Sequence, residues 1–245
     1  MKRVLALLLA AACVLAWPLA HAEVAPPPAK GFAGLDQGGA EAVAVPGDSP
    51  AFVRPGKEGS REVLLYLHGR CGNPFAGARS FPEAAAARGT MVIVLGDDRC
   101  PNSSRRRWSG DMKHNQARID AALAAVAASL GRDLDRQSLT AIGYSEGALK
   151  AEQLARLFPE RYPRVLLIGS PRPPSPHNLG KTRAIATLVG ERDAQQDMRA
   201  GTKALEKAGR NVRFWLLPGA RHGQYGPEGE RVMGEALDWV FAQSP

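Results

Sequence analysis

The feature that most constrains the fold of this chain is a series of short apolar runs without polar alternation. The runs at residues 63–67 and 91–95 come first, and each ends in a turn that contains glycine. Such runs are typical of strands that are covered on both faces of a sheet. Helical patterns separate the runs, so the sequence predicts an α/β fold with a mostly parallel central sheet and helices on both faces. Four further strands are expected at 139–144, 165–168, 185–189 and 212–217.

The expected helices show one-sided apolar spacing and end at glycine. Between residues 119 and 130, apolar side chains recur at intervals of four, three and four, and Gly131 ends the pattern. A shorter, alanine-rich stretch begins at residue 81 and stops at Gly89. Further helices are expected at 146–158, 194–208 and 232–241.

The N-terminal segment has the pattern of a secretory signal peptide. Two basic residues precede an apolar stretch at 4–15, and a small-x-small pattern closes the segment at 20–22, which predicts a signal peptide over residues 1–22. The alternative is an uncleaved anchor helix, but the apolar stretch is short for a membrane span and Pro18 interrupts its end. We therefore expect export to a periplasm or to the medium, and no membrane span once the signal is removed.

The remaining chain is expected to hold one domain. Residues 23–39 are rich in Pro, Ala and Gly and show no apolar period, which is typical of a flexible lead-in. Residues 40–245 form the predicted domain, which opens with a hairpin between 42–45 and 51–53.

Composition excludes several other classes of protein. A chain of 245 residues with 44% hydrophobic residues and three cysteines is neither disordered nor a cysteine-stapled mini-domain. Its net charge of +8 is spread along the sequence, apart from three consecutive arginines at 105–107. Zinc-ligand spacing, an RNP-like motif and a longer basic block are absent from the sequence, so we expect no nucleic-acid partner.

The most informative motif is the pentapeptide at 143–147, which lies between a predicted strand and a predicted helix. Ser145 has Gly143 two residues before it and Gly147 two residues after it. A nucleophile on a sharp strand-to-helix turn needs such small neighbours, because larger side chains would collide with nearby backbone. The alternative is an ordinary glycine-rich turn. The flanking strand and helix favour a nucleophilic Ser145.

A serine nucleophile requires a base and a carboxylate that orients the base. His222 follows the last predicted strand, so it is expected at the carboxyl edge of the sheet, where Ser145 also lies. Asp193 follows the strand at 185–189 and is the preferred orienting carboxylate, with Glu191 as its substitute and Asp197 as a third option. Alternatively, Asp193 only caps the helix that follows it.

Two cysteines remain after the predicted signal peptide is removed. In an oxidising compartment Cys71 and Cys100 are a candidate disulfide, and two free thiols are the alternative.

With these residues in the order Ser145, Asp193, His222, the chain resembles the α/β-hydrolase superfamily over residues 63–241. In its size, its predicted export signal, its His68-Gly69 turn and its lack of a cap, the chain also resembles the branch of polyhydroxybutyrate depolymerases and feruloyl esterases. It is somewhat similar to the dienelactone hydrolases, although those enzymes normally have a cysteine nucleophile. The resemblance implies a serine hydrolase in which these three residues form the catalytic triad.

The resemblance also assigns an oxyanion hole. One donor would be the amide of Glu146, and the other would be the amide of Arg70, or that of Cys71 if the turn is one residue wider. His68 would brace this turn or be an ordinary loop histidine. Because the resemblance places the strands at 63–67 and 91–95 side by side, Cys71 and Cys100 would lie close enough to bridge and to brace the oxyanion loop.

Three further segments bear on the site. Only residues 171–183 separate two strands where lipases place a helical cap, so we expect no cap domain and an open site. The loop at 102–108 is either a wall that binds acidic substrate through its arginines and stacks rings on Trp108, or a solvated basic turn whose tryptophan lies in the core. Asp97 and Asp98 lack the further ligands of a metal site.

The sequence and the resemblance together predict an exported serine hydrolase that cleaves carboxylic esters through an acyl-enzyme. The substrate would be a small-molecule or polymeric ester, and neither cofactor nor metal would be needed. The alternatives are a serine peptidase of the prolyl-oligopeptidase type and a hydrolase-fold binding protein that has lost catalysis.

Overall fold

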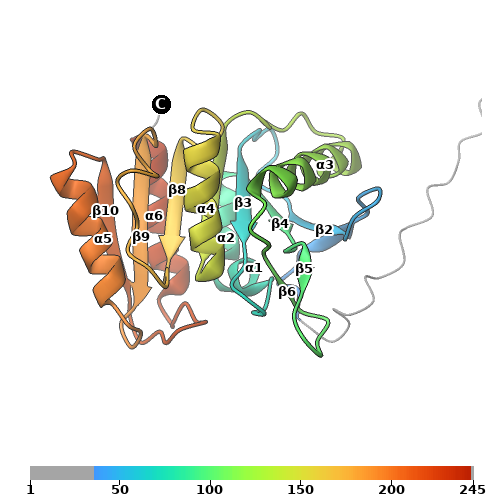
Figure 1. Cartoon of the computed structure of the whole chain (residues 1–245). Coiled ribbons are helices and arrows are strands. Elements are labelled where there is room, and N and C mark those ends of the chain that lie inside the picture. Colours follow the sequence, from blue (N-terminus) through green and yellow to red (C-terminus); the bar gives the residue numbers. More distant parts are fainter. Residues whose placement is uncertain (1–35, 244–245) are drawn as a thin grey trace, which may run out of the picture.

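The computed structural model describes residues 36–243 and contains one eight-stranded sheet with helices on both faces (Figure 1). The strand order is β1-β2-β4-β3-β7-β8-β9-β10. Strands β1 (Glu41–Val43) and β2 (Ala51–Arg54) are antiparallel and lie at one edge. The other six strands are parallel to one another: β3 (Val63–Leu67), β4 (Thr90–Val94), β7 (Leu139–Tyr144), β8 (Arg164–Ile168), β9 (Ala184–Gly190) and β10 (Val212–Leu217).

This sheet confirms the predicted α/β class. Three of the six parallel strands have the predicted bounds, and the others differ from them by one residue at one or both ends. The predicted hairpin is also present, as β1 and β2. The predicted signal peptide lies outside the described residues, as does most of the predicted lead-in. The last four residues of that lead-in form a turn, and Arg54 donates a hydrogen bond of 2.7 Å to the carbonyl oxygen of Gly38 there.

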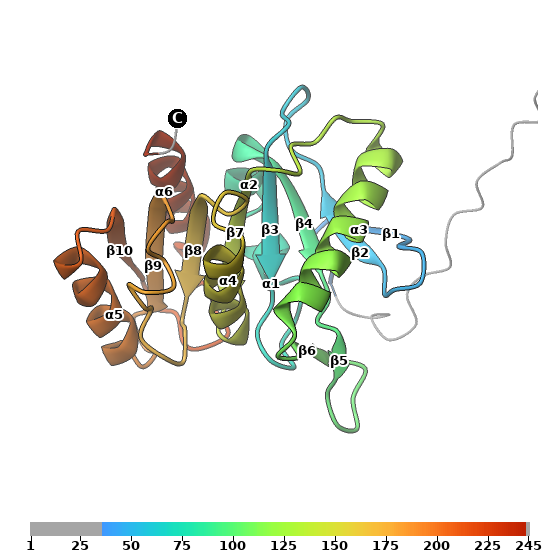
Figure 2. The ribbon, with the colours of Figure 1, turned by 45° about the horizontal axis from the view of Figure 1, so that its top comes forward.

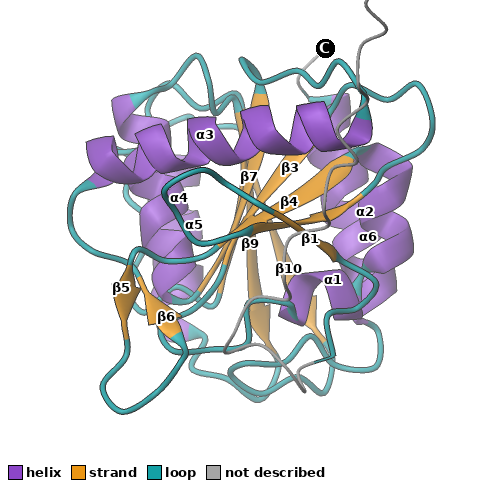
Figure 3. Cartoon of the chain, turned by 90° about the vertical axis from the view of Figure 1, so that its right-hand side faces the viewer, coloured by secondary structure: helices purple, strands orange, loops and turns teal. Residues whose placement is uncertain are grey.

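Two helical layers enclose the sheet, as Figure 3 shows. One layer holds α3 (Met112–Leu130), α4 (Glu146–Leu157) and α5 (Gln196–Lys207), which pack on one face. The other layer holds α1 (Ala76–Ser80), α2 (Pro82–Arg88) and α6 (Gly229–Ala242). The sheet therefore has an apolar core on each side.

Strand β3 shows why the apolar runs lack alternation. Leu65 points into the core beneath α3 and α4, whereas Leu64 and Tyr66 point into the core beneath α2 and α6. All three are at most 1% exposed. Because successive side chains of a strand point to opposite faces, a strand with a core on each side has no position for a polar residue.

Helix α3 begins seven residues before the predicted start. Asp111 caps it, because the carboxylate accepts hydrogen bonds from the amides of Lys113 and His114. Gly131 ends it in the left-handed conformation, as the sequence predicts.

Two small elements were not expected from the sequence. The first is α1, which follows the turn after β3. The second is a hairpin of β5 (Asp98–Arg99) and β6 (Arg106–Arg107), which projects beyond the carboxyl ends of β3 and β4 (Figure 2). Its two strands have two residues each, too few to show any periodicity in the sequence.

A half-buried ion pair fastens the edge hairpin to α3. The guanidinium of Arg118 binds both carboxylate oxygens of Asp48, at 2.7 and 2.8 Å, and also donates to the carbonyl oxygen of Leu95 at 2.9 Å. The Arg118 side chain is 9% exposed. It therefore joins the turn after β1, the end of β4 and the middle of α3.

We expect Arg118→Met to lower the free energy of unfolding by about 3 kcal/mol, because it leaves the Asp48 carboxylate and a buried carbonyl without their partner. Denaturant-induced unfolding followed by circular dichroism measures this. The matched control is Arg61→Met, which removes an exposed pair with Asp133 and should change stability by less than about 1 kcal/mol. Equal effects of the two variants would contradict this role of Arg118.

Candidate active site

Ser145 lies on a strained turn between β7 and α4. Its φ of 54° and ψ of −115° are rare for a residue with a side chain. A Cβ on Gly143 would lie 2.3 Å from the carbonyl oxygen of Gly147, and one on Gly147 would lie 1.9 Å from that of Leu67. Only glycine fits at these two positions, so the predicted reason for the motif agrees with the packing.

A continuous hydrogen-bonded chain joins Ser145 to the two other predicted residues. His222 Nε2 lies 3.1 Å from Ser145 Oγ, and His222 Nδ1 lies 2.7 Å from Asp193 Oδ2. The carboxylate can only accept, so Nδ1 carries the proton and Nε2 is free to accept the serine proton. The arrangement has the geometry of a nucleophile, its base and an orienting group.

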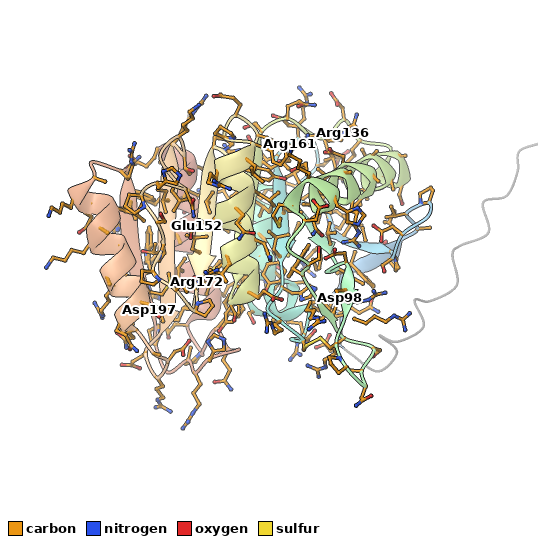
Figure 4. All side chains as sticks on the ribbon, in the orientation of Figure 1. Asp98, Arg136, Glu152, Arg161, Arg172 and Asp197 are labelled. Atoms are coloured by element: carbon orange, nitrogen blue, oxygen red, sulfur yellow. A yellow bond between two sulfur atoms is a disulfide. The ribbon has the colours of Figure 1, made fainter. Side chains whose placement is uncertain are left out.

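Asp193 contacts the histidine, and the two alternative carboxylates do not. It follows the turn after β9, where its other oxygen accepts a hydrogen bond from the Ala194 amide at 2.7 Å. Glu191 instead accepts from the amide of Gly219 at 2.7 Å and so holds the loop that carries His222. Asp197 lies in the first turn of α5 (Figure 4).

Two backbone amides near Ser145 in the sequence or the fold have no hydrogen-bond acceptor within the described protein. The Ser145 side chain makes no capping hydrogen bond to α4, so the first amide of that helix, on Glu146, stays free. Gly69 lies close to the serine, because a Cβ on it would be 3.2 Å from Ser145 Cβ. Within residues 36–243 neither the Glu146 amide nor the Arg70 amide donates to a protein acceptor. These are the two preferred donors of the predicted oxyanion hole.

The amide of Cys71, which was the alternative donor, cannot serve as an oxyanion donor. This amide donates to the carbonyl oxygen of Arg106 at 2.9 Å, so it is committed to the β5–β6 hairpin. The sequence did not reveal this bond, because the hairpin that provides the acceptor was not predicted.

A pocket of about 120 Å³ adjoins Ser145 and His222. Tyr66, Ala76 and Tyr144 supply its apolar walls. The Tyr144 hydroxyl accepts a hydrogen bond of 2.6 Å from the Gly223 amide, which fixes the loop beside His222. Burial raises the pKa of Tyr144 to about 12, so this hydroxyl stays neutral in the physiological range.

Solved structures with the same architecture match the chain. A carboxylesterase from Bacillus cereus matches with a TM-score of 0.56 and 22% identity, over 78% of this chain and 94% of its own. A dienelactone hydrolase from Anabaena variabilis matches with a TM-score of 0.61 and 17% identity, over 83% and 96%. A truncated carbohydrate esterase from gut microbiota matches with a TM-score of 0.60 and 12% identity, over 84% and 96%. No protein-family model and no curated protein sequence matches the chain.

The chain has the α/β-hydrolase fold. The strained turn at Ser145 follows β7, which lies beside β3 in the middle of the sheet, and β3 and β4 are adjacent and parallel, as the resemblance implied.

A disulfide braces the loop after β3, where the sequence analysis places the oxyanion donor. Cys71 and Cys100 are bonded, with their Cα atoms 5.9 Å apart. The hairpin adds further contacts, because Arg105 donates to the carbonyl oxygen of Cys71 at 3.1 Å. The loop after β3 is thus held by one covalent bond and by hydrogen bonds on both sides of Cys71.

His68 braces the same loop from inside. The residue is 1% exposed, its Nδ1 lies 2.8 Å from the carbonyl oxygen of Gly69, and its Nε2 accepts from the Gly96 amide at 3.0 Å. Burial lowers the pKa of His68 to about 4, so the ring is neutral and can accept at Nε2 while Nδ1 donates. This position agrees with the structural role that the sequence analysis preferred.

The tryptophan of the 102–108 loop belongs to the core. Trp108 is 4% exposed, and its indole N–H donates to the carbonyl oxygen of His68 at 2.9 Å. It offers no exposed ring for stacking, so the interpretation of this loop as an aromatic wall is wrong. Of the two neighbouring carboxylates, Asp97 accepts from the Ser109 amide and Asp98 pairs with Arg107.

The segment between β8 and β9 carries no helix among the described residues and forms no cap. It is fastened to α4 instead, because the carboxylate of Glu152 accepts hydrogen bonds from Ser175 and Asn178. Figure 4 shows Glu152 on α4 and Arg172 on this segment. The site is therefore open on this side, and His222 keeps 51% of its side chain exposed.

Within residues 36–243, no cluster of three His, Cys, Asp or Glu side chains could hold a metal ion. No helix in this part of the chain is long and apolar enough to cross a bilayer.

The depressed pKa of His68 predicts a specific loss of stability in acid. Above pH 6.5 the ring is neutral in both states, whereas between pH 6.5 and about 4 the unfolded chain binds a proton that the folded protein does not. The free energy of unfolding should therefore fall by about 3 kcal/mol over this interval as the pH decreases. Denaturant unfolding at several pH values measures it. Parallel curves for the wild type and His68→Gln would contradict the assignment.

Reduction of the disulfide is expected to lower both stability and site function. Opening a loop of this length costs roughly 3 to 4 kcal/mol in the chain-entropy model, and the oxyanion loop loses its covalent brace. Thermal unfolding and reactivity of Ser145 toward a fluorophosphonate, with and without reductant, measure the two effects. The double variant Cys71→Ser/Cys100→Ser should not respond to reductant. An unchanged rate in the reduced wild type would contradict the role of the disulfide.

Proposed function

We propose that this protein is an exported serine hydrolase that cleaves carboxylic esters through an acyl-enzyme. The observation that carries the proposal is the hydrogen-bonded chain from Asp193 through His222 to Ser145, which ends at a strained elbow beside two free amides. This arrangement supplies a nucleophile, a base and donors for a negative oxygen within one site.

The acylation step follows from the geometry. Ser145 Oγ attacks the ester carbonyl carbon while His222 Nε2 takes its proton, and the carbonyl oxygen becomes an oxyanion that accepts from the amides of Arg70 and Glu146. When the intermediate collapses, the carbon–oxygen bond to the alcohol breaks and the histidinium protonates the leaving alkoxide. Asp193 stabilises the histidinium and keeps its ring oriented.

Deacylation repeats these steps with water. His222 takes a proton from a water molecule, and the hydroxide attacks the acyl carbon. The second tetrahedral intermediate expels Ser145, which recovers its proton from the histidinium, and a carboxylic acid leaves. All proton transfers pass through one nitrogen, Nε2.

The preference for esters rests on two observations. The matched structures include a carboxylesterase and a carbohydrate esterase by name. The pocket beside Ser145 has a volume of about 120 Å³, which is near that of four water molecules in the liquid and suits a short acyl or alcohol group. The open edge of the site admits a larger group on the other side of the ester.

Export is supported by the signal-peptide pattern and the disulfide. The sequence at residues 1–22 has the charge and apolar pattern of a secretory signal. Disulfides form and persist in a periplasm or outside the cell and are rare in reducing cytosol. The Cys71–Cys100 bond suits such a location.

Hydrolysis of p-nitrophenyl esters from acetate to laurate by the mature protein tests the proposal. We expect turnover of acetate and butyrate, a steep decline beyond the length that fills the pocket, and a loss of at least about 1,000-fold in Ser145→Ala. Mass spectrometry after fluorophosphonate treatment should locate the adduct on Ser145. Absence of both turnover and adduct would support a binding protein without catalysis, and turnover of peptides alone would support a peptidase.

A further inference from the structure

We propose that the ion pair between Arg70 and Glu146 positions the oxyanion hole and neutralises the negative charge beside it. The inference rests on the proposed function and assigns two side chains that the triad does not include. These residues also provide the two free amides of the hole. The side chain of each residue therefore helps to hold the other residue, whose amide is the second proposed donor.

The pair closes a ring of hydrogen bonds around the oxyanion loop. Arg70 donates from Nε and Nη2 to Oε1 of Glu146, at 3.0 and 2.9 Å. The other oxygen, Oε2, accepts from the Trp108 amide at 3.1 Å, and the indole of Trp108 donates to the carbonyl oxygen of His68. Because His68 and Arg70 lie in the same turn, the ring fixes that turn relative to the start of α4.

The negative charge of Glu146 affects the oxyanion that the proposed hole has to stabilise. The Glu146 side chain is only 9% exposed, and covalent geometry keeps its carboxylate within about 6 Å of its own amide. A bare carboxylate there would repel the oxyanion that the same amide has to stabilise. The Arg70 guanidinium, which is 68% exposed, covers this carboxylate from the solvent side.

The carboxylate cannot simply swing away when Arg70 is removed. The Trp108 amide holds Oε2, and Lys150, one turn along α4, faces the same region while donating to the carbonyl oxygen of Ser109 at 2.8 Å. Removing Arg70 alone should therefore leave a fixed negative charge beside the hole that Lys150, which is held by Ser109, offsets only in part, whereas removing both charges should not. If Arg70 acts by neutralising charge, the single variant should therefore be less active than the double variant. If Arg70 acts only by packing, the double variant should not regain activity.

Three variants test the proposal: Arg70→Met, Glu146→Gln and the double variant. For p-nitrophenyl acetate we expect kcat/KM to fall at least about ten-fold in Arg70→Met and roughly three-fold in Glu146→Gln. The double variant should match Glu146→Gln, so the second substitution restores activity to Arg70→Met. The matched control is Arg61→Met, an arginine paired with Asp133 at the amino end of β3, which should leave kcat/KM unchanged.

A trifluoromethyl ketone supplies a readout that a purely structural role would not move. It adds to Ser145 as an oxyanion, so its inhibition constant should rise by the same factor by which kcat/KM falls in each variant. Circular dichroism and thermal unfolding identify any variant that does not fold. If Arg70→Met fails to fold, Arg70→Lys replaces it in the test. Lysine keeps the charge without the paired contact from Nε and Nη2, so its kcat/KM should lie between those of the wild type and Glu146→Gln, and a larger loss would contradict the charge-neutralising role.

The outcomes distinguish this inference from the proposed function. An inactive wild type without a Ser145 adduct overturns both. If the wild type is active but the loss of kcat/KM in the double variant equals the product of the losses in the two single variants, the charge-neutralising pair is contradicted and the proposed function is not. Inhibition constants that stay constant while kcat/KM falls overturn it as well.

Discussion

The close approach of α4 to the end of β3 is the constraint on which the rest of the site depends. Gly147 has room for no side chain, because the carbonyl oxygen of Leu67 lies where its Cβ would be. This contact brings the first turn of α4 against the loop after β3 and forces Ser145 into its strained conformation. The proposed nucleophile and the two proposed oxyanion donors lie close together because these two backbone segments are in contact. Gly143 serves a second close contact, between β7 and the start of α4, because a Cβ there would lie 2.3 Å from the carbonyl oxygen of Gly147.

The loop after β3 needs more support than a short connection usually has. It must hold one amide toward the substrate while Cys71 turns its own amide toward the β5–β6 hairpin. The support comes from a neutral buried histidine, a disulfide, a buried tryptophan and the ion pair to Glu146. Preorganised donors stabilise a developing charge without reorganising, so rigidity in this loop would serve the catalysis that we propose.

The parts of the structure that the sequence predicted are those governed by local pattern. Strands that are buried on both faces appear in the sequence as continuous apolar runs. The glycines at 143 and 147 were predicted correctly as required neighbours of Ser145, because side chains there would collide with backbone. The order of serine, aspartate and histidine along the chain, with each after a strand, was enough to bring them to one edge, because parallel strands share their carboxyl edge.

The parts that the sequence did not predict depend on long-range contacts. The β5–β6 hairpin has two residues per strand and no periodicity, so it could not be predicted from the sequence. The hydrogen bond from the Cys71 amide to the carbonyl oxygen of Arg106, which excludes Cys71 as an oxyanion donor, could therefore not be predicted either. The bond between Arg118 and Asp48 joins residues that are 70 positions apart, and that between Arg70 and Glu146 spans 76. Helix α1 has five residues, and its short sequence carries no helical period.

In the proposed mechanism, Ser145 attacks a carbonyl whose oxygen accepts hydrogen bonds from the amides of Arg70 and Glu146. A crystal structure of the protein inactivated by a short alkyl fluorophosphonate would show whether these contacts form. We expect phosphorus bonded to Ser145 Oγ, with the phosphoryl oxygen about 2.7 to 3.1 Å from both amide nitrogens and the alkyl group in the pocket beside Tyr66. A phosphoryl oxygen turned toward solvent, or an adduct on another residue, would contradict this mechanism.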